Sequence, residues 1–365
     1  MKQLYPLLLL TFISTFTFAQ CDGRYQTEIF SSVTVTEVNY SNNIQDSYHE
    51  MDIYTPDGDT EINRPVILYM HGGSFYGGTK VMTDCVDFCT SMAKRGYVTA
   101  SLNYRLTTVW DFLASQEEQY ITVLKAVADA KSAIRYFRKN FANGDTHGVD
   151  PNTIFIGGYS AGGVIALHLA YIDDLSDLPT SPINVQNLVS NIGGDLEGDA
   201  GNYGYSSEVQ GVISFAGGIN DVNWIDASDE PLVSIQGEND VTVNYYCGPG
   251  TNNPLVLDLC GSGEMHPRAD NIGVLNDHLN FSGTDHLWAA NGNSNSKFLQ
   301  ALEFTKDFLY PLLPCNNTTA INERSSEKQL IKVVDLLGRE VKLQNNRPQF
   351  YIYNDGSVER KIIIK

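Results

Sequence analysis

Ser160 is the residue best placed in this sequence to act as a nucleophile. It belongs to a Gly-x-Ser-x-Gly pattern, Gly158-Tyr159-Ser160-Ala161-Gly162. Residues 153–156 before it predict a short buried strand, and the apolar residues 164–170 after it predict a helix. A serine between a strand and a helix stands on a tight turn, which only small neighbours such as the two glycines allow. We expect the N–H of Ala161 to point toward a developing oxyanion.

His286 is the base that we assign to this serine. A serine hydroxyl becomes a good nucleophile only when a base lies within hydrogen-bond reach and an acid orients that base. Around a turn of this kind the three residues follow in the order serine, acid, histidine. His286 lies after the last predicted strand of the core and before its last helix, whereas the competing His278 begins that strand.

Asp240 is our choice for the acid. It lies in the loop Gly237-Glu238-Asn239-Asp240, which directly follows a strand predicted at 231–235. The alternatives are Glu238, in the same loop, and Asp221, after the preceding strand.

A second group of backbone N–H donors is expected upstream of the nucleophile. Residues 65–70 form a continuous apolar run, which is typical of a strand covered on both faces. His71-Gly72-Gly73-Ser74 follows it without a break. We assign Gly72 and Gly73 to the oxyanion hole, because glycine lets a backbone approach the substrate closely.

The elements that must hold these residues alternate between strand and helix. This order predicts an α/β fold, a mostly parallel sheet with helices on both faces, in which functional loops gather at the carboxyl ends of the strands. Two strands near 33–38 and 51–54 form an antiparallel pair at the start. Polar segments at 172–207 and 244–263 predict excursions from the core.

Taken together, these motifs resemble the α/β-hydrolase superfamily, and within it the carboxylesterase and lipase branch with an HGG oxyanion loop. The residues that carry the resemblance are His71-Gly72-Gly73-Ser74-Phe75, Asn103-Tyr104-Arg105-Leu106, Gly158-Tyr159-Ser160-Ala161-Gly162-Gly163, Asp240 and His286. The resemblance implies an eight-stranded α/β-hydrolase sheet over residues 20–315 and hydrolysis of carboxylic esters without a cofactor. Ser74 departs from the third glycine often found in the loop, and Tyr159 from the acidic residue or histidine common before the nucleophile.

The substrate is predicted less sharply than the reaction. Aromatic residues that follow predicted strands are candidates for substrate binding: Phe75, Tyr159, Trp224 and Trp288. An aromatic wall would suit a hydroxycinnamate or an aromatic polyester, while the alternative is packing in the core. The functions considered are therefore a general carboxylesterase, a feruloyl or acetylxylan esterase, an aromatic polyester hydrolase and, in another class, an inactive binding protein on the same fold.

Composition narrows the choice of partners. The chain has 365 residues, 42% of them hydrophobic, and a formal net charge of −19, which disfavours nucleic acid and anionic membrane surfaces as partners.

Its six cysteines allow several disulfide pairings, with Cys247 and Cys260 as the first expected pair. Cys85 and Cys89, one helical turn apart, could bridge, pack or resemble half of a metal site. Because no zinc-site spacing completes them, we expect no metal.

Both ends of the chain predict export. Residues 1–19 combine Lys2, an apolar stretch and Thr17-Phe18-Ala19 before a cleavage point, as in a secretory signal peptide. No later segment is long enough to span a membrane. After an expected linker at 316–322, residues 323–365 predict a small all-β module. Segments 334–341 and 361–365 of this module resemble the sorting domain of the type IX secretion system, which implies that machinery as a partner and a location outside a Gram-negative cell.

Overall fold

The computed structural model describes Cys21 and residues 23–315, and in the tail 330–334, 339, 341, 349–353 and 358–361. The chain divides into two compact units between Asn316 and Asn317. The segments predicted as signal peptide, at 1–19, and as linker, at 316–322, lie outside the described residues. The assignments of residues 20–315 and 323–365 as functional domains stay predictions.

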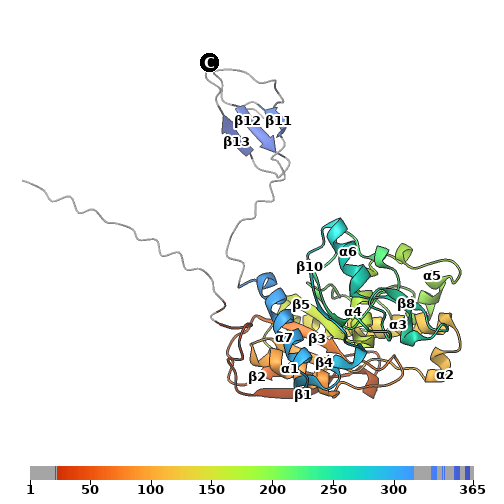
Figure 1. Ribbon diagram of the computed structural model, residues 1–365. Helices are drawn as coiled ribbons and strands as arrows, with labels where there is room; N and C mark the ends of the chain where they lie inside the picture. Colours follow the sequence, from red (N-terminus) through yellow and green to blue (C-terminus); the bar gives the residue numbers. More distant parts are fainter. Residues whose placement is uncertain are drawn as a thin grey trace, which may run out of the picture. The chain divides into compact units, whose positions relative to one another are not determined.

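A mixed eight-stranded sheet forms the centre of the first unit (Figure 1). Its strands in chain order are β1 Val33–Asn39, β2 Glu50–Pro56, β3 Arg64–Met70, β4 Val98–Leu102, β5 Val149–Tyr159, β6 Val212–Phe215, β7 Leu232–Gly237 and β10 Asn276–Phe281. The spatial order is β1-β2-β4-β3-β5-β6-β7-β10. β1 pairs with β2, and β2 with β4, in antiparallel fashion, and the remaining pairs are parallel. The predicted fold class is confirmed.

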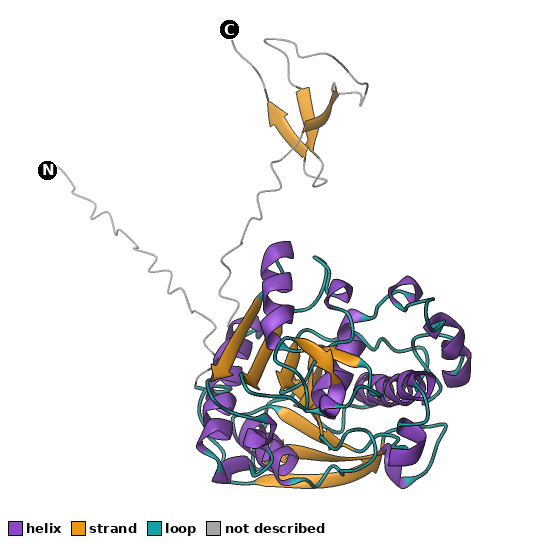
Figure 2. Ribbon diagram, turned by 45° about the vertical axis from the view of Figure 1, so that its right-hand side comes forward, coloured by secondary structure: helices purple, strands orange, loops and turns teal. Residues whose placement is uncertain are grey.

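Helices cover both faces of this sheet (Figure 2). They are α1 Thr83–Lys94, α2 Val109–Phe112, α3 Gln116–Ala142, α4 Ala161–Tyr171, α5 Val185–Leu188, α6 Ser262–Ile272 and α7 Ser296–Leu309. Side chains along β3 alternate between the two faces. Val66 and Leu68 pack in the cluster that contains α3 and α4, while Ile67 and Tyr69 pack in the one that contains α1 and α7.

The two polar segments leave the core as predicted. Residues 172–207 contain α5 and short 3₁₀ turns, and residues 244–263 contain a hairpin of β8 Cys247–Pro249 and β9 Asp258–Cys260. Cys247 and Cys260 lie opposite each other in this hairpin and form a disulfide, which confirms the predicted pair.

The other described cysteines fall into two kinds. Cys21 and Cys315 form a second disulfide, which joins the first and the last described residues of the first unit. Cys85 and Cys89 are free thiols on α1 and are fully buried. Burial raises the pKa of both thiols. Of the three roles left open by their spacing, the structure shows two small side chains packed in the core.

The second unit contains three described strands, β11 Leu330–Val334, β12 Gln349–Tyr353 and β13 Val358–Lys361. They form one antiparallel sheet in the order β11-β12-β13, as expected for a small all-β module. Among the described residues, no helix has both the length and the apolar character needed to cross a bilayer.

Candidate active site

Ser160 lies on a strained turn between β5 and α4. Its φ of 56° and ψ of −117° place it in a region that L-residues rarely occupy, and its N–H donates to the Phe215 carbonyl at 2.8 Å. A Cβ on Gly158 would lie 2.6 Å from the Met70 carbonyl oxygen, and one on Gly162 would overlap the same oxygen. The close passage of β3 therefore explains why both flanking positions are glycine.

The structure brings the three residues predicted as nucleophile, base and acid into one chain of hydrogen bonds. Ser160 Oγ lies 2.7 Å from His286 Nε2, and Asp240 Oδ2 lies 2.7 Å from His286 Nδ1. All three residues are buried. With a proton on Nδ1 donated to Asp240, Nε2 is free to accept the serine proton.

The alternative acids and base lie elsewhere. Glu238 and Asp221 are exposed, and Asp221 caps the short 3₁₀ turn Val222–Trp224. His278 is exposed on β10, where its ring stacks on that of His266 at 4.3 Å. Each alternative is near the right strand in sequence, but the described hydrogen bonds of the His286 ring go to Asp240 and Ser160 and to none of the three.

Backbone groups hold the acid and the base in place. Asp240 Oδ1 accepts hydrogen bonds from the N–H groups of Thr242 and Val243, at 2.9 and 3.0 Å. The Tyr159 hydroxyl donates to the His286 carbonyl at 2.9 Å, and the Tyr159 ring stacks on the imidazole with centroids 5.4 Å apart. Tyr159, expected to bind substrate, contacts His286 and does not line either cavity described below.

The His71–Phe75 loop passes directly beside Ser160. A Cβ on Gly72 would lie 3.1 Å from the Ser160 Cβ, and Gly73 has a φ of +122°. Ser74 and Phe75 also have positive φ values, of 52° and 66°. Such backbone strain in consecutive residues is typical of functional loops. The N–H of Ala161 opposite has no partner within α4, because it belongs to the first helical residue.

The motif Asn103-Tyr104-Arg105-Leu106 supports this loop. The Tyr104 hydroxyl donates to the His71 carbonyl at 2.8 Å, and the two rings stack at 4.3 Å. Burial lowers the pKa of His71 to about 4, so its ring is neutral near pH 7. Arg105 in turn binds the buried Asp129. Sequence reasoning quoted this motif only as a family feature and missed its role under the loop.

A small apolar cavity opens beside Ser160. Its volume is about 40 Å³. The lining residues are Ser74, Phe75, Phe112, Ser160, Ala161, Val164, Thr242, Val243, Gly250, Thr251, Val256 and Leu259. Phe75 was predicted here. No sequence pattern pointed to the lining residues that come from α2 and from the 244–263 segment.

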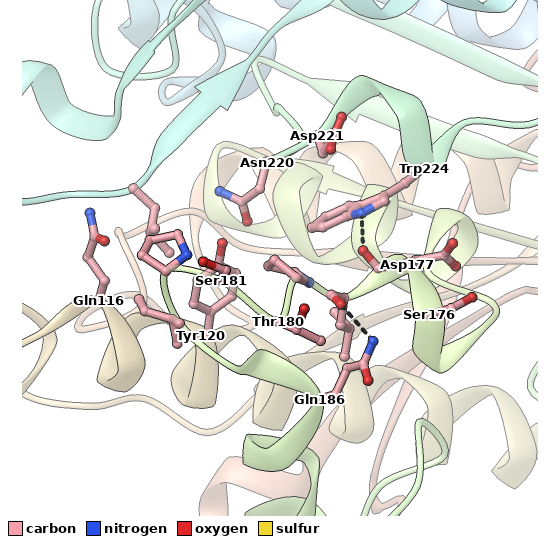
Figure 3. A pocket seen from close by; sticks show the side chains of 15 residues that line it. Gln116, Tyr120, Ser176, Asp177, Thr180, Ser181, Gln186, Asn220, Asp221 and Trp224 are labelled. Atoms are coloured by element: carbon pink, nitrogen blue, oxygen red, sulfur yellow. Dashed lines mark hydrogen bonds between the residues drawn. The ribbon is translucent and has the colours of Figure 1, made fainter.

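A second cavity, of about 410 Å³, contains Trp224 (Figure 3). The Trp224 indole N–H donates to the Asp177 carbonyl at 2.7 Å. The other tryptophans do not line either cavity. Trp288 is 2% exposed and packs against Phe215 and Phe281 behind His286, and Trp110 is 81% exposed. Trp224 and Trp288, expected to form one aromatic wall, therefore do not line a common cavity among those described here.

One group of carboxylates has the geometry to attract a cation. Oxygens of Asp173, Asp226 and Asp229 lie within 4.8 Å of one another. Two of these residues are exposed, and acidic groups of this kind are common on protein surfaces without a bound ion. We assign no metal to them.

Comparison with known proteins agrees with this architecture. The truncated form of a carbohydrate esterase from gut microbiota superposes with a TM-score of 0.53 over 77% of this chain and 96% of that one, at 19% identity. Esterase 2 of Thermogutta terrifontis phosphorylated by paraoxon gives the same TM-score over 78% and 95%, at 21% identity. The chain has the α/β-hydrolase fold.

Sequence comparisons point the same way over shorter stretches. The sequence model of the BD-FAE family matches residues 51–221, from β2 to the loop after β6. Carboxylesterase 3B of Mus musculus is 33% identical over 124 residues, which are 33% of this chain and 20% of that protein. The matches cover between 20% and 39% of the length of the curated relatives. These findings support the superfamily of α/β-hydrolase esterases.

Proposed function

We propose that this protein is a serine hydrolase of carboxylic esters. The observation that carries the proposal is the hydrogen-bonded chain from Ser160 through His286 to Asp240, with a nucleophile held at positive φ beside a strained glycine loop. The esterases among its relatives and structural neighbours support the same reaction.

The reaction would proceed in two halves. Ser160 Oγ attacks the ester carbonyl carbon while His286 Nε2 takes the serine proton, and Asp240 stabilises the resulting imidazolium. The N–H groups of Gly72, Gly73 and Ala161 would bind the oxyanion. The alcohol leaves with the proton from His286 and an acyl-enzyme remains. Water, deprotonated by His286, then releases the carboxylic acid.

The cavity beside Ser160 favours a short acyl group. A volume of about 40 Å³ is the space of roughly three water molecules. An acetyl or propionyl group fits this volume, whereas a hydroxycinnamoyl group would require the wall to move. Among the hypotheses from the sequence, removal of acetyl groups is therefore favoured over feruloyl or aromatic polyester hydrolysis.

Two experiments with the full chain test the proposal. Hydrolysis of p-nitrophenyl acetate is expected for the native protein and is expected to be lost in Ser160→Ala. Labelling with a fluorophosphonate probe should occur at Ser160 only. Activity that persists in Ser160→Ala would disprove the assignment, and a native protein that neither hydrolyses nor labels would support an inactive binding protein instead.

We also propose that the protein is exported and that residues 323–365 direct this export through the type IX secretion system. Its two disulfides support an oxidising location. Deletion of 323–365 in a Gram-negative host with that machinery should trap the protein in the periplasm, which fractionation and immunoblotting measure. Unchanged release of the shortened chain would exclude this role.

A further inference from the structure

The cavity that contains Trp224 is well formed, and the proposed reaction does not use it. Its volume is about ten times that of the cavity beside Ser160. Three segments enclose it: the start of α3, the loop from 176 to 186, and the segment from Asn220 to Trp224. Figure 3 shows Gln116 and Tyr120 on one side of the cavity and Trp224 on the other. A molecule bound here would thus lie between aromatic side chains.

The Trp224 ring is held rigidly. Besides the hydrogen bond to the Asp177 carbonyl, it makes an edge-to-face contact with the His168 ring, with centroids 5.4 Å apart, and only 7% of the residue is exposed. His168 is itself fixed by Asn220 Oδ1 and the Val164 carbonyl, at 2.7 and 2.8 Å. A fixed aromatic surface costs little entropy when a ligand stacks on it.

Polar side chains around this ring are available for hydrogen bonds. Among the described residues, none hydrogen-bonds the side chains of Gln116, Tyr120, Thr180 or Ser181. The Gln186 amide uses one N–H for the Leu178 carbonyl and keeps its oxygen free. Amide and hydroxyl groups around an aromatic face match the alternating apolar faces and hydroxyl edges of a sugar ring.

The charge of the residues that line the large cavity disfavours anionic ligands. Asp177 and Asp221 contribute carboxylates, and no Lys, Arg or His is among the described residues that line the cavity. A phosphate or an acidic sugar would meet negative charge with no compensating cation. A purely aromatic ligand would leave the polar groups of the lining without partners.

The two cavities share one wall. Val256 and Leu259 line the small cavity, while Leu257 between them lines the large one. Gln119 of α3 clamps this wall, since its Nε2 donates to the Leu255 carbonyl at 2.8 Å and its Oε1 accepts from the Leu257 N–H at 2.9 Å. The Cys247–Cys260 disulfide closes the same segment. Both cavities are therefore preformed.

The separation between Ser160 and the Trp224 cavity suits an extended, chain-like ligand. His168 follows Ser160 by eight residues along α4. At 1.5 Å per residue, this separates the two positions by about 12 Å along the helix axis. His168 contacts both Asn220 and Trp224 of the large cavity. A ligand that reaches both Ser160 and Trp224 must be longer than one small ester.

We propose that the Trp224 cavity is a subsite for neutral sugar units of an acylated oligosaccharide or polysaccharide, whose ester group is presented to Ser160. This inference rests on the proposed ester hydrolysis for its purpose, but sugar binding by the cavity can be measured without it.

The direct test is calorimetric titration of neutral xylo-oligosaccharides and manno-oligosaccharides into full-chain Ser160→Ala, in which turnover cannot interfere. Binding is expected for at least one series and is expected to be lost in Ser160→Ala/Trp224→Ala. The matched control is Ser160→Ala/Trp110→Ala, because Trp110 is exposed and lines neither cavity. Absence of binding by both sugar series, or equal binding by the Trp224 and control variants, would overturn the proposal.

Kinetics of Trp224→Ala in the otherwise native chain provide the second readout. We expect kcat/KM for p-nitrophenyl acetate to stay within about twofold, while kcat/KM for an acetylated oligosaccharide falls at least about tenfold, mainly through KM. Gln116→Ala removes a partly exposed side chain without a hydrogen-bond partner, so it keeps the test valid if Trp224→Ala fails to fold.

The outcomes separate the two proposals. Sugar binding without any hydrolysis by the native protein would remove the esterase assignment and keep the subsite. Hydrolysis of small esters without sugar binding would keep the esterase assignment and remove the subsite. Loss of activity in Trp224→Ala toward a soluble terephthalate diester, with sugar substrates unaffected, would show an aromatic subsite and contradict the sugar assignment.

Discussion

The two cavities on either side of the Val256–Leu259 wall differ in size and in how their polar groups are paired. The one beside Ser160 is small and apolar, and Ser160 in its wall is joined to His286 and Asp240 in one short hydrogen-bonded chain. The one around Trp224 is large, and several of its polar side chains have no partner among the described residues. A site whose polar groups are already paired can do chemistry at a fixed position, whereas unpaired groups around an aromatic ring can recognise a ligand. Variants of the hydrogen-bonded chain at Ser160 should therefore affect all ester substrates equally, and variants of the Trp224 cavity should affect only long ones.

Asp240→Asn should give the largest effect. An amide cannot keep His286 in the required tautomer or stabilise its charged form, so kcat should fall about 10⁴-fold for small and polymeric esters alike. Initial rates on p-nitrophenyl acetate and on an acetylated oligosaccharide measure this. Glu238→Gln, in the same loop but exposed, serves as the control and should change little. A larger loss in the control than in Asp240→Asn would transfer the acid role to Glu238.

Tyr159→Phe should have the next largest effect. It leaves the buried carbonyl of His286 without its donor, at a cost of roughly 1–3 kcal/mol, and loosens the base. We expect kcat to fall about tenfold for every ester while KM changes little. The control is Tyr136→Phe, whose hydroxyl contacts His147 instead. If KM rose and kcat did not change, Tyr159 would contact substrate, as the sequence first suggested.

Ser160, His286 and Asp240 were grouped from the sequence, and the structure brings them within hydrogen-bond distance. Each is fixed by a local pattern: the glycines around Ser160, the loop after β7 for Asp240, and the position of His286 after β10. The mostly parallel sheet was also predictable, because buried strands alternate with helices along the chain, and so was its mixed character, because an antiparallel pair comes first.

The walls of the two cavities could not be predicted in this way. Leu257 and Gln119 are 138 residues apart, and only the folded hairpin with its disulfide brings them together. The tryptophans show the same limit. Trp224 and Trp288 both follow strands and both are buried, but they pack in different core clusters, and of the two only Trp224 borders a cavity described above. A position after a strand does not determine the direction of a side chain.

Val256 and Leu257 are consecutive residues of the shared wall, but they line different cavities. Substituting them one at a time tests whether the two cavities act separately. Val256→Ala enlarges the cavity beside Ser160, so preference for butyrate over acetate esters should rise about threefold to fourfold per accommodated methylene, the equivalent of about 0.8 kcal/mol. Leu257→Ala, its matched partner, should leave acyl preference unchanged and raise KM only for the oligosaccharide ester. Chain-length profiles with p-nitrophenyl esters measure the first effect. Identical behaviour of the two variants would mean that the cavities act as one site.

Substitution of Asp84 is expected to have the smallest effect on activity. Its carboxyl group is fully buried at the start of α1, and its Oδ1 has no hydrogen-bond partner. Burial raises the pKa of Asp84 to about 7, and after burial its charge is the next contribution to the raised pKa of Tyr159. Between its unfolded pKa of 3.8 and about 7, the folded state holds a proton that the unfolded state has lost. The free energy of unfolding contributed by Asp84 is therefore greatest below pH 4 and declines as pH rises to 7.

Asp84→Asn removes this titration, because the amide stays neutral at every pH. The variant should be more stable than the native protein by a few kcal/mol at pH 8, and the difference should shrink toward pH 4. Urea unfolding at pH 5 and pH 8 measures this, with Glu117→Gln, an exposed carboxylate in the first turn of α3, as the control. A gain that is equal at both pH values would show that Asp84 is already ionised in the fold. A buried negative charge would then act on Tyr159, next to the paired groups around Ser160.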